Sequence, residues 1–429
     1  MTSSNPAVFP SQTKAPDCYR VLHTSDWHLG KMLNDQSREE EHARFLDWLL
    51  EAIGEHAVDA LVVAGDLFDS ANPPQAAQAQ YYDFVSALFR QGDCAMVVVG
   101  GNHDSPGQLE APNKVLHALG VHVLGFLPDA PQDRLVALPS QESPHLIIAA
   151  VPFLRDRDLR TGQSGQGVTD IQRERLAGTA QRYAETAEVA AEWSGKGVPI
   201  LATGHLMVMG TSSSESEREI HIGGLGAVKG NVFPELFSYV ALGHMHRPQR
   251  TGGSEHIRYS GSPIPLSFSE ANDRKEVRLL DFAHGSLREQ GRLPVPVFRK
   301  LSQIRTNRAD LERELDEFLP ESSDFTTWVE VVVEDAGIGE NLNEVVQEAV
   351  EDRDFEVLKV LRGGATSLQG MSAEKLSDDE GIDTLLDDPS QVFQQRLDEE
   401  IGFTEEERRE LQMAFAQLLE IHDDKGASA

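Results

Sequence analysis

Five short motifs place metal-capable side chains directly after apolar runs of strand length. In chain order they are TSDWHLG with Asp26 and His28, VVAGDLFDS with Asp66 and Asp69, VVVGGNHDSP with Asn102, His103 and Asp104, LATGHLM with His205, and VALGHMHRP with His244 and His246. In open α/β sheets, ligands bind at the carboxyl ends of the strands. We therefore expect these side chains to converge on one place.

The donors of these motifs are oxygen and nitrogen, without sulfur. Such a set suits Mn²⁺, Fe²⁺, Zn²⁺ or Mg²⁺ and disfavours a structural zinc site, which usually includes cysteine. Since there are more donors than one cation needs, a carboxylate that bridges two cations is the economical arrangement. Two cations about 3.5–4 Å apart can hold a hydroxide and stabilise an in-line displacement at phosphorus. The motifs thus predict phosphoester chemistry.

Each motif taken alone also has a structural explanation. Asp-x-His at a strand end can be a cap, Asn-His-Asp before Ser-Pro can be a turn, and His-Met-His can be a solvated loop. The order and the glycine punctuation of all five together favour the metal site. We expect His23, inside the first apolar run, to be a packed strand residue. The arginines of FLRDRDLR, which begin at Arg155, alternate with aspartates, and this favours a salt-bridged surface over DNA contact.

Residues 20–290 predict one α/β domain that positions the motifs. Its expected strands are the apolar runs YRVLHTS, DALVVAGD, AMVVVGGN, HLIIAAVPF, PILATGH and FSYVALGH. Between the first two runs, Phe45, Leu49 and Ile53 repeat every four residues, which predicts a helix with one apolar face. A second long helix is expected from about residue 171 to residue 193. The strand–helix–strand order favours right-handed crossovers and buried sheets.

The sequence changes character after residue 290. Residues 291–365 predict a small α+β domain. Its expected helices cover 308–319 and 342–350, and its expected strands cover 327–335 and 355–361.

The remaining segments are a linker, a helical tail and two disordered ends. Residues 366–386 are polar and rich in Gly, Ser and Asp, as a linker would be. Residues 387–422 predict a hairpin of two amphipathic helices, which either folds back or docks on a partner protein. Residues 1–19 and 423–429 are expected to be disordered.

The negative charge of the chain limits how it could bind a polyanion such as nucleic acid. The net charge is −32, and residues 291–429 alone hold 34 acidic and 14 basic side chains. Attraction to nucleic acid needs Lys and Arg at the phosphates, so bulk attraction is excluded. A polyanionic substrate would then require bound cations, a local basic patch or a partner. An acidic host proteome is an alternative source of the excess charge.

The amino-acid composition also indicates the class of protein and the cellular compartment in which it is expected. The 429 residues are 40% hydrophobic and 25% charged, which is ordinary for a soluble globular protein. The apolar runs are shorter than the roughly 18–20 residues that span a bilayer, and the N-terminus lacks the features of a secretory signal. Cys18 and Cys94 cannot form a disulfide framework, so the cytoplasm is the expected compartment.

The motif order also carries a family resemblance. D-x-H, G-D-x-x-D, G-N-H-D, G-H and G-H-x-H together resemble the signature of the calcineurin-like metallophosphoesterases. The stretches LHTSDWHLGK, SESEREIHIGGLGAV, FSYVALGHMHRPQ and IRYSGSPIPLSFSE further resemble the nuclease subunits of bacterial SbcCD complexes, over about residues 20–282. The resemblance implies a double-sheet sandwich flanked by helices, with the 291–365 domain capping DNA.

The same resemblance implies roles for the site residues. One metal would be held by Asp26, His28 and His246, a second by Asn102, His205 and His244, and Asp66 would bridge the two. His103 would be the acid that protonates the leaving 3′ oxygen, and Asp104 would orient its ring. Archaeal members of the family carry a second His where this chain has Asp69, so Asp69 could either support a ligand or only shape the turn.

The implied activity is that of a two-metal DNA nuclease, with Mn²⁺ as the expected ion and Mg²⁺ as the alternative. It would degrade double-stranded ends from 3′ to 5′ and open hairpins as a single-strand endonuclease. The implied partner is an SbcC-type coiled-coil ABC ATPase, bound through the C-terminal helices, with a homodimer inside a heterotetramer at the nucleoid and no membrane contact. The alternatives are a metallophosphoesterase of small phosphoesters or cyclic nucleotides, and a non-catalytic scaffold with the same fold.

Overall fold

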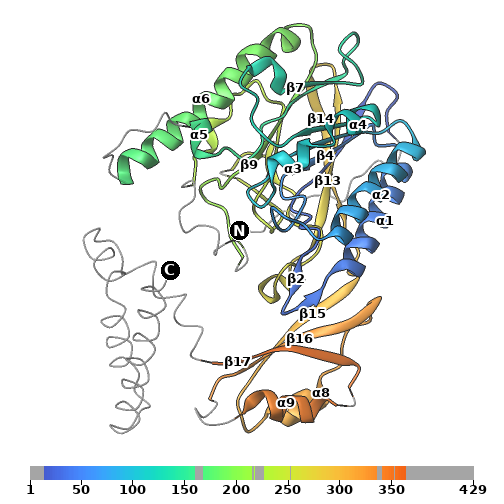
Figure 1. The fold of residues 1–429 in the computed structure, drawn as a ribbon, viewed down its shortest axis with the longest axis vertical. Coiled ribbons are helices and arrows are strands. Elements are labelled where there is room, and N and C mark those ends of the chain that lie inside the picture. The colour runs from blue at the N-terminus through green and yellow to red at the C-terminus, as the bar shows by residue number, and fades with distance from the viewer. Residues whose placement is uncertain are drawn as a thin grey trace, which may run out of the picture. The chain divides into compact units, whose positions relative to one another are not determined.

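The computed structural model describes residues 14–159, 168–214, 217, 227–251, 253–335, 341–351 and 353–363. The predicted linker and helical hairpin lie outside these residues, as does most of the predicted N-terminal lead-in. Residues Met1–Leu361 form one compact unit (Figure 1). Among the residues described, no helix is long and apolar enough to span a bilayer.

Two six-stranded mixed sheets form the first domain. The first has the order β14 (Ser286–Pro294), β13 (Glu276–Ala283), β1 (Tyr19–Thr24), β4 (Ala60–Ala64), β5 (Ala95–Val99) and β6 (Val121–Leu124). The second has the order β11 (Gln249–Arg250), β12 (Ile257–Tyr259), β10 (Tyr239–Gly243), β9 (Ile200–His205), β8 (Leu146–Ala149) and β7 (Leu135–Leu138). The central strands of each sheet are parallel, so their carboxyl ends lie along one edge.

The sheets pack face to face because both faces of their strands are apolar. Along β4, Ala60 and Val62 join a core that also contains residues of the second sheet, such as Leu201. The alternate residues Leu61 and Val63 join a core on the opposite face of the first sheet. This alternation is what a strand buried on two sides requires. The predicted double-sheet α/β architecture is therefore confirmed.

Helices cover the outer faces of the sandwich. The helices α1 (Glu39–Glu55) and α2 (Gln75–Gln91) lie side by side on the first sheet, and α6 (Val168–Gly195) covers the second (Figure 1). The short elements are β2 (Met32–Leu33), β3 (Gln36–Ser37), α3 (Pro106–Glu110), α4 (Asn113–Ala118), α5 (Asp156–Leu159) and the 3-10 turns η1 (Pro131–Arg134), η2 (Gly230–Val232) and η3 (Phe268–Glu270). The six predicted strands and both long helices of this domain are confirmed.

The second domain is a three-stranded sheet with two helices. Its elements are β15 (Arg299–Thr306), α8 (Leu311–Glu317), β16 (Phe325–Val333), α9 (Leu342–Val350) and β17 (Phe355–Arg362), in the sheet order β15-β16-β17. Both helices pack on one face of the sheet. The predicted boundary at residue 290 needs correction, because it falls inside β14, which pairs with β13 and extends the first domain to Pro294.

The two domains are joined by a buried charged junction, which we call the Glu41 junction and which contains Arg38, Glu41, Arg299 and Trp328. Glu41 Oε1 accepts hydrogen bonds from Nε of Arg38 at 2.7 Å and from Nε of Arg299 at 2.9 Å. The Arg299 guanidinium lies over the Trp328 ring, 4.0 Å from its centroid. The sequence pattern did not indicate Arg299, because the only apolar residues of β15, Leu301 and Ile304, are three positions apart and do not alternate.

Replacing Glu41 by alanine should destabilise the protein strongly. The change leaves two buried guanidinium groups without their carboxylate, and the expected loss in the free energy of unfolding is about 3–5 kcal/mol. Glu40→Ala is the matched control, because the Glu40 side chain is 71% exposed and pairs with Arg299 at 3.5 Å. Exposed pairs contribute about 0–1 kcal/mol. Urea unfolding measures both variants, and equal losses would contradict a structural role for the junction.

Candidate metal centre

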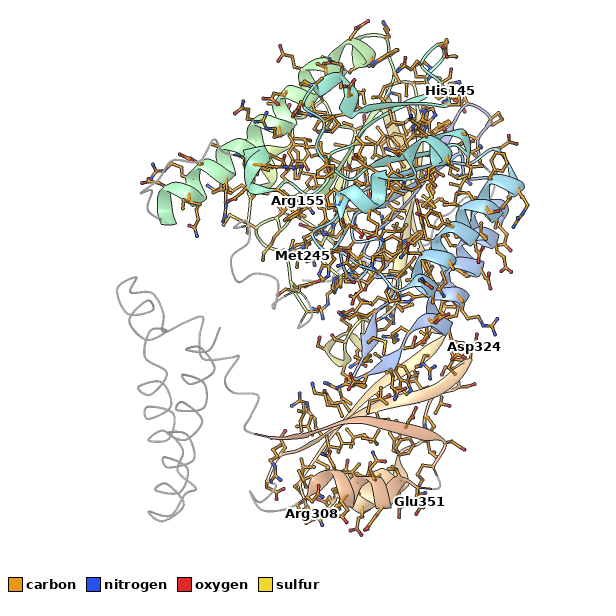
Figure 2. The ribbon with its side chains drawn as sticks, viewed as in Figure 1. His145, Arg155, Met245, Arg308, Asp324 and Glu351 are labelled. Carbon is orange, nitrogen blue, oxygen red and sulfur yellow. The ribbon has the colours of Figure 1, made fainter. Side chains whose placement is uncertain are left out.

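All five motifs lie at the carboxyl ends of strands, as predicted. Three follow β1, β4 and β5 of the first sheet, and two follow or end β9 and β10 of the second. In Figure 2, Met245 and Arg155 lie at one end of the first domain, and His145, which precedes β8, lies at the other. The candidate site is thus assembled from both sheets at their common edge.

A first group contains Asp26, His28 and His246, whose ligand atoms lie within 4.8 Å of one another. The His28 and His246 rings meet edge to face with centroids 5.1 Å apart. Asp26 Oδ1 accepts the backbone N–H of His244 at 2.9 Å, and Oδ2 accepts the hydroxyl of Ser25 at 2.5 Å. All three members are buried.

A second group surrounds the side-chain oxygen of Asn102. Asn102 Oδ1 lies 2.9 Å from His205 Nε2 and 3.1 Å from His244 Nδ1. The other ring nitrogen of His205, Nδ1, lies 2.9 Å from the backbone carbonyl of Ala64, so it donates its hydrogen there. Nε2 of His205 is therefore the ring nitrogen that faces Asn102 and that could bind a cation.

Asp66 lies between the two groups. Its Oδ2 is 3.1 Å from His205 Nε2 and 3.6 Å from His28 Nε2, and its Oδ1 accepts the backbone N–H of His103 at 2.9 Å. Burial alone would raise the pKa of this carboxyl, but His205, His28 and His103 hold it well below its usual range. One carboxylate thus faces imidazoles from both sheets.

Asp69 supports His28 from behind. Asp69 Oδ1 lies 3.1 Å from His28 Nδ1. The other ring nitrogen of His28, Nε2, therefore points toward Asp66. Burial would raise the pKa of Asp69, but His28 and Lys31 lower it to about 2. Burial in turn lowers the pKa of His28, which favours the neutral imidazole that a metal requires. Asp69 thus contacts the ring of His28, which is the contact that a role in supporting a ligand would require.

Asp104 and His103 differ from the prediction that the carboxylate orients the ring. His103 Nδ1 lies 2.7 Å from the backbone carbonyl of Asp69, which fixes the ring instead. The Asp104 carboxylate accepts three backbone N–H groups, from Leu67, Phe68 and Gly101, at 2.9–3.1 Å. Burial and the Asp66 charge raise the pKa of Asp104 to about 6 despite these bonds. Asp104 therefore braces two loops of the site and does not touch the His103 ring.

The glycines of the motifs are required by close approach. A Cβ added to Gly65, whose φ is +93°, would lie 2.1 Å from His205 Nδ1, and one added to Gly101 would lie 2.1 Å from Asp66 Oδ1. Real Cβ contacts are never this short, so no side chain fits at either position. Glycine lets the backbone of one loop approach a ligand of another.

Four of the residues predicted to bind a cation have their backbone in the left-handed region. Asp26, His28, Asp66 and His244 have φ values of 52°, 46°, 49° and 99°. Residues other than glycine rarely adopt such values, and they persist where the surroundings impose them. Strain gathered at four residues of one cluster is typical of a functional site.

The cluster fits divalent cations. The carboxylates of Asp26 and Asp66 are 0% and 1% exposed, and buried carboxylates need a cation or another charged partner. Nε2 of His28 is a buried nitrogen without a hydrogen-bond partner among the described residues. The donors are imidazole, carboxylate and amide groups, which suit Mn²⁺, Fe²⁺, Zn²⁺ and Mg²⁺.

The residue between His244 and His246, Met245, is buried and fixes the positions of both histidines. Met245 is 0% exposed and packs in the core of the second sheet with residues such as Leu242 and Tyr259. The two imidazoles therefore project from a fixed point, His244 toward Asn102 and His246 toward Asp26 and His28.

Two other sequence expectations can be compared with the structure. His23 is fully buried between the sheets and bonds to Tyr239 and Leu242, and its pKa falls to about 3 through burial, so it is a packed strand residue as predicted. The arginines of FLRDRDLR were expected on a salt-bridged surface, and Arg157, whose side chain is 59% exposed, does pair with Asp158 at 3.6 Å. Arg155 differs, because its Nη2 donates to the backbone carbonyl of Asp104 at 3.1 Å, which places a cation beside the site.

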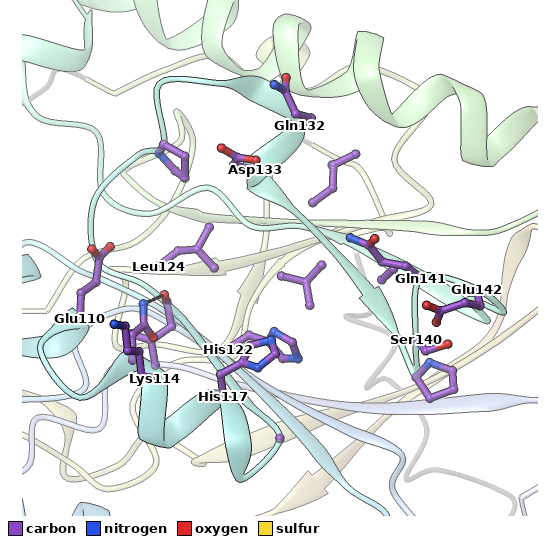
Figure 3. Close-up of a pocket in the computed structure, with 18 residues that line it drawn as sticks. Glu110, Lys114, His117, His122, Leu124, Gln132, Asp133, Ser140, Gln141 and Glu142 are labelled. Atoms are coloured by element: carbon purple, nitrogen blue, oxygen red, sulfur yellow. Dashed lines mark hydrogen bonds between the residues drawn. The ribbon is translucent and has the colours of Figure 1, made fainter.

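A cavity of about 1180 Å³ opens away from the cluster, beside β6, β7 and α4 (Figure 3). It contains the edge-to-face pair His117 and His122, with ring centroids 4.9 Å apart. None of the predicted site residues lines it. Among the described residues, the clusters of three or more His, Asp and Glu side chains that could hold a cation lie at the strand ends instead.

Comparison with known families identifies two regions. The family described as calcineurin-like phosphoesterase matches residues 19–248. The SbcD C-terminal family, described as the Type 5 capsule protein repressor C-terminal domain, matches residues 297–400. The second match includes the small α+β domain. The motifs that resemble the family lie before this domain, in about residues 20–282.

Curated relatives share most of the chain. The SbcD subunit of the nuclease SbcCD from Escherichia coli (strain K12) is 39% identical over 345 residues, which are 80% of this chain and 85% of the relative. The corresponding SbcD subunit from Bacillus subtilis (strain 168) is 33% identical over 73% of this chain and 78% of the relative. Among solved structures, a dimetal phosphatase from Danio rerio aligns with a TM-score of 0.38 and 14% identity, over 65% of this chain and 99% of that chain.

Replacing Asp104 by asparagine should weaken the fold at the site. The amide nitrogen cannot accept a hydrogen bond, so at least one buried backbone N–H would lose its partner, at a cost of about 1–3 kcal/mol. Asp133→Asn is the control, because Asp133 is exposed. The free energy of unfolding of the two variants measures the difference. A loss for Asp104→Asn no larger than that of the control would refute the bracing role.

Proposed function

Because the chain belongs to the SbcD family of nuclease subunits, we propose that it is the metal-dependent nuclease subunit of an SbcCD-type DNA repair and recombination complex. The observation that carries the proposal is the position of Asp66 Oδ2, which faces His28 of one group and His205 of the other. A carboxylate in this position can belong to two cation sites at once, which suits displacement at phosphorus.

In this proposal the two groups are two cation sites. Asp26, His28 and His246 would hold the first cation, Asn102, His205 and His244 would hold the second, and Asp66 would be shared by both. Mn²⁺ is the proposed ion, with Mg²⁺ as the alternative. When bound, two divalent cations offset the negative charge of a phosphodiester and lower the pKa of water toward about 7.

His103 is proposed as the acid of the reaction. Its Nδ1 is bound to the carbonyl of Asp69, so a proton for transfer would be held at Nε2, a buried atom without a hydrogen-bond partner among the described residues. The His103 ring lies edge to face with that of His28, 4.8 Å away between centroids. From this position it would protonate the leaving 3′ oxygen, a role for which imidazole is suited near neutral pH.

The proposed substrates are double-stranded DNA ends and hairpins. The chain would degrade ends from 3′ to 5′ and open hairpins, and the domain from β15 to β17 would cover the DNA. Arg155 supports this reading, because it supplies a cation beside the site of a chain whose net charge is −32. The Glu41 junction would hold the covering domain in place.

The proposed partner is an SbcC-type coiled-coil ABC ATPase. The predicted helices of residues 387–422, which lie outside the described residues, would bind its coiled coil. Two copies of each subunit would form a heterotetramer. Such a partner would supply much of the positive surface that the chain lacks.

A nuclease assay with Mn²⁺ tests the activity. We expect cleavage of blunt and hairpin DNA that is abolished by chelation, and we expect DNA to be preferred over a phosphomonoester. His103→Ala should lower cleavage by about 10²–10⁴-fold, because a general acid contributes a factor of this size. It should leave the bound Mn²⁺ unchanged.

The control for this variant is His117→Ala, which removes an imidazole outside the site. Preference for a phosphomonoester or a cyclic nucleotide would favour another metallophosphoesterase. Cation binding without cleavage of any of these substrates would favour a scaffold. Retained cleavage in His103→Ala would refute its role as the acid.

Deleting residues 385–429 should separate binding from catalysis. The truncated chain should no longer co-purify with the ATPase, yet it should still cleave a small phosphodiester with Mn²⁺, because residues Met1–Leu361 form a compact unit of their own. Co-purification of the full chain serves as the control. Unchanged binding of the ATPase by the truncated chain would refute docking through these helices.

A further inference from the structure

A buried network of charged side chains lies behind His246. Glu217, Glu270 and Lys275 are 0%, 0% and 6% exposed. They come from parts of the chain outside the five motifs. Burying charged groups costs free energy unless each is paired, so a network of three calls for an explanation.

Glu270 contacts the ring of His246. Its Oε1 lies 3.4 Å from His246 Nδ1, at the long end of a hydrogen bond, and its Oε2 accepts Lys275 Nζ at 2.6 Å and the backbone N–H of Leu266 at 3.1 Å. The ion pair with Lys275 and the hydrogen bond from Leu266 hold the carboxylate in one orientation. Its other oxygen, Oε1, is thereby kept on the side of the His246 ring.

The same network holds the backbone of His246. Lys275 Nζ donates to the His246 carbonyl at 2.9 Å, and Glu217 Oε1 accepts the His246 backbone N–H. Lys275 Nζ also donates to the hydroxyl of Ser262 at 2.9 Å. His246 is thus held at its ring, its carbonyl and its amide by buried charged side chains.

We propose that Glu270, fixed by Lys275, is the positioning residue of the first cation site. It keeps the Nδ1 hydrogen of His246 toward the carboxylate, so that Nε2 is the ligand atom, and it raises the basicity of the ring. The inference rests on the proposed function, in which His246 holds a cation with Asp26 and His28.

The network predicts that the two cation sites depend on different partners. Both imidazoles of the first site contact carboxylates, His28 that of Asp69 and His246 that of Glu270. In the second site the His205 ring contacts the carbonyl of Ala64. Because Glu270 acts on the ring of His246, loss of its charge weakens the first site and leaves the second unchanged.

Titration of the cation-free protein with Mn²⁺ tests the proposal, with free Mn²⁺ followed by electron paramagnetic resonance. In the wild type we expect two bound Mn²⁺ ions per chain. Glu270→Gln should weaken the binding of one ion about 10–100-fold and leave the binding of the other unchanged. The double variant Glu270→Gln with Lys275→Met removes both charges of the pair, so that no buried charge is left alone, and it should lose the same factor.

Asp273→Asn is the matched control. Asp273 lies on the same segment and pairs with Arg247, the residue after His246, at 3.0 Å. It does not touch the ring, so both affinities should stay as in the wild type. Adding Glu270→Gln to His246→Ala should cause no further loss, since the carboxylate acts through that ring.

The outcomes are distinguishable. Two unchanged affinities in Glu270→Gln and in the double variant would overturn the positioning role and leave the proposed function standing. A further loss of Mn²⁺ binding on adding Glu270→Gln to His246→Ala would also overturn it. Failure of the wild type to bind Mn²⁺ at all would instead overturn the proposed function.

Discussion

The structure depends on the place where one buried carboxylate, Asp66, meets imidazoles from two sheets. Neither sheet alone supplies a complete group of the proposed ligands. Asp26, His28, Asp66 and Asn102 follow strands of the first sheet, and His205, His244 and His246 end or follow strands of the second. The apolar core between the sheets therefore does more than stabilise the fold. It sets the distance between the halves of the site, and a shift of one sheet by an ångström or two would separate Asp66 from His205.

The charge of the protein is consistent with this arrangement. A chain with a net charge of −32 that also buries several carboxylates in one cluster has a strong local demand for cations. Divalent ions would satisfy that demand and would also attract a phosphodiester that the rest of the surface repels. Among the described residues, three cationic side chains near the cluster are already engaged: Lys275 is paired with Glu270, Lys31 with Asp69, and Arg155 is bonded to the carbonyl of Asp104.

Local patterns predicted the strands, the long helices and the convergence of the motifs, because each depends on a few neighbouring residues. They did not predict β15, whose only apolar residues, Leu301 and Ile304, do not alternate, or the contacts between residues distant in sequence. Asp104 follows His103 directly, which suggested contact between their side chains, yet its carboxylate turns back to the loop after β4. Glu270 ends the stretch IRYSGSPIPLSFSE, but nothing in that stretch indicates its contact, and only the structure shows that it faces His246.

The glycines of the motifs have a consequence for how such a chain can vary through evolution. Gly65 and Gly101 have no side chain to take part in chemistry, yet an alanine at either would push directly against a ligand. A mutation there would displace His205 or Asp66 without removing any donor. Which residues can stand at these two positions is therefore limited by free space, as the histidine positions are limited by the need for a nitrogen donor.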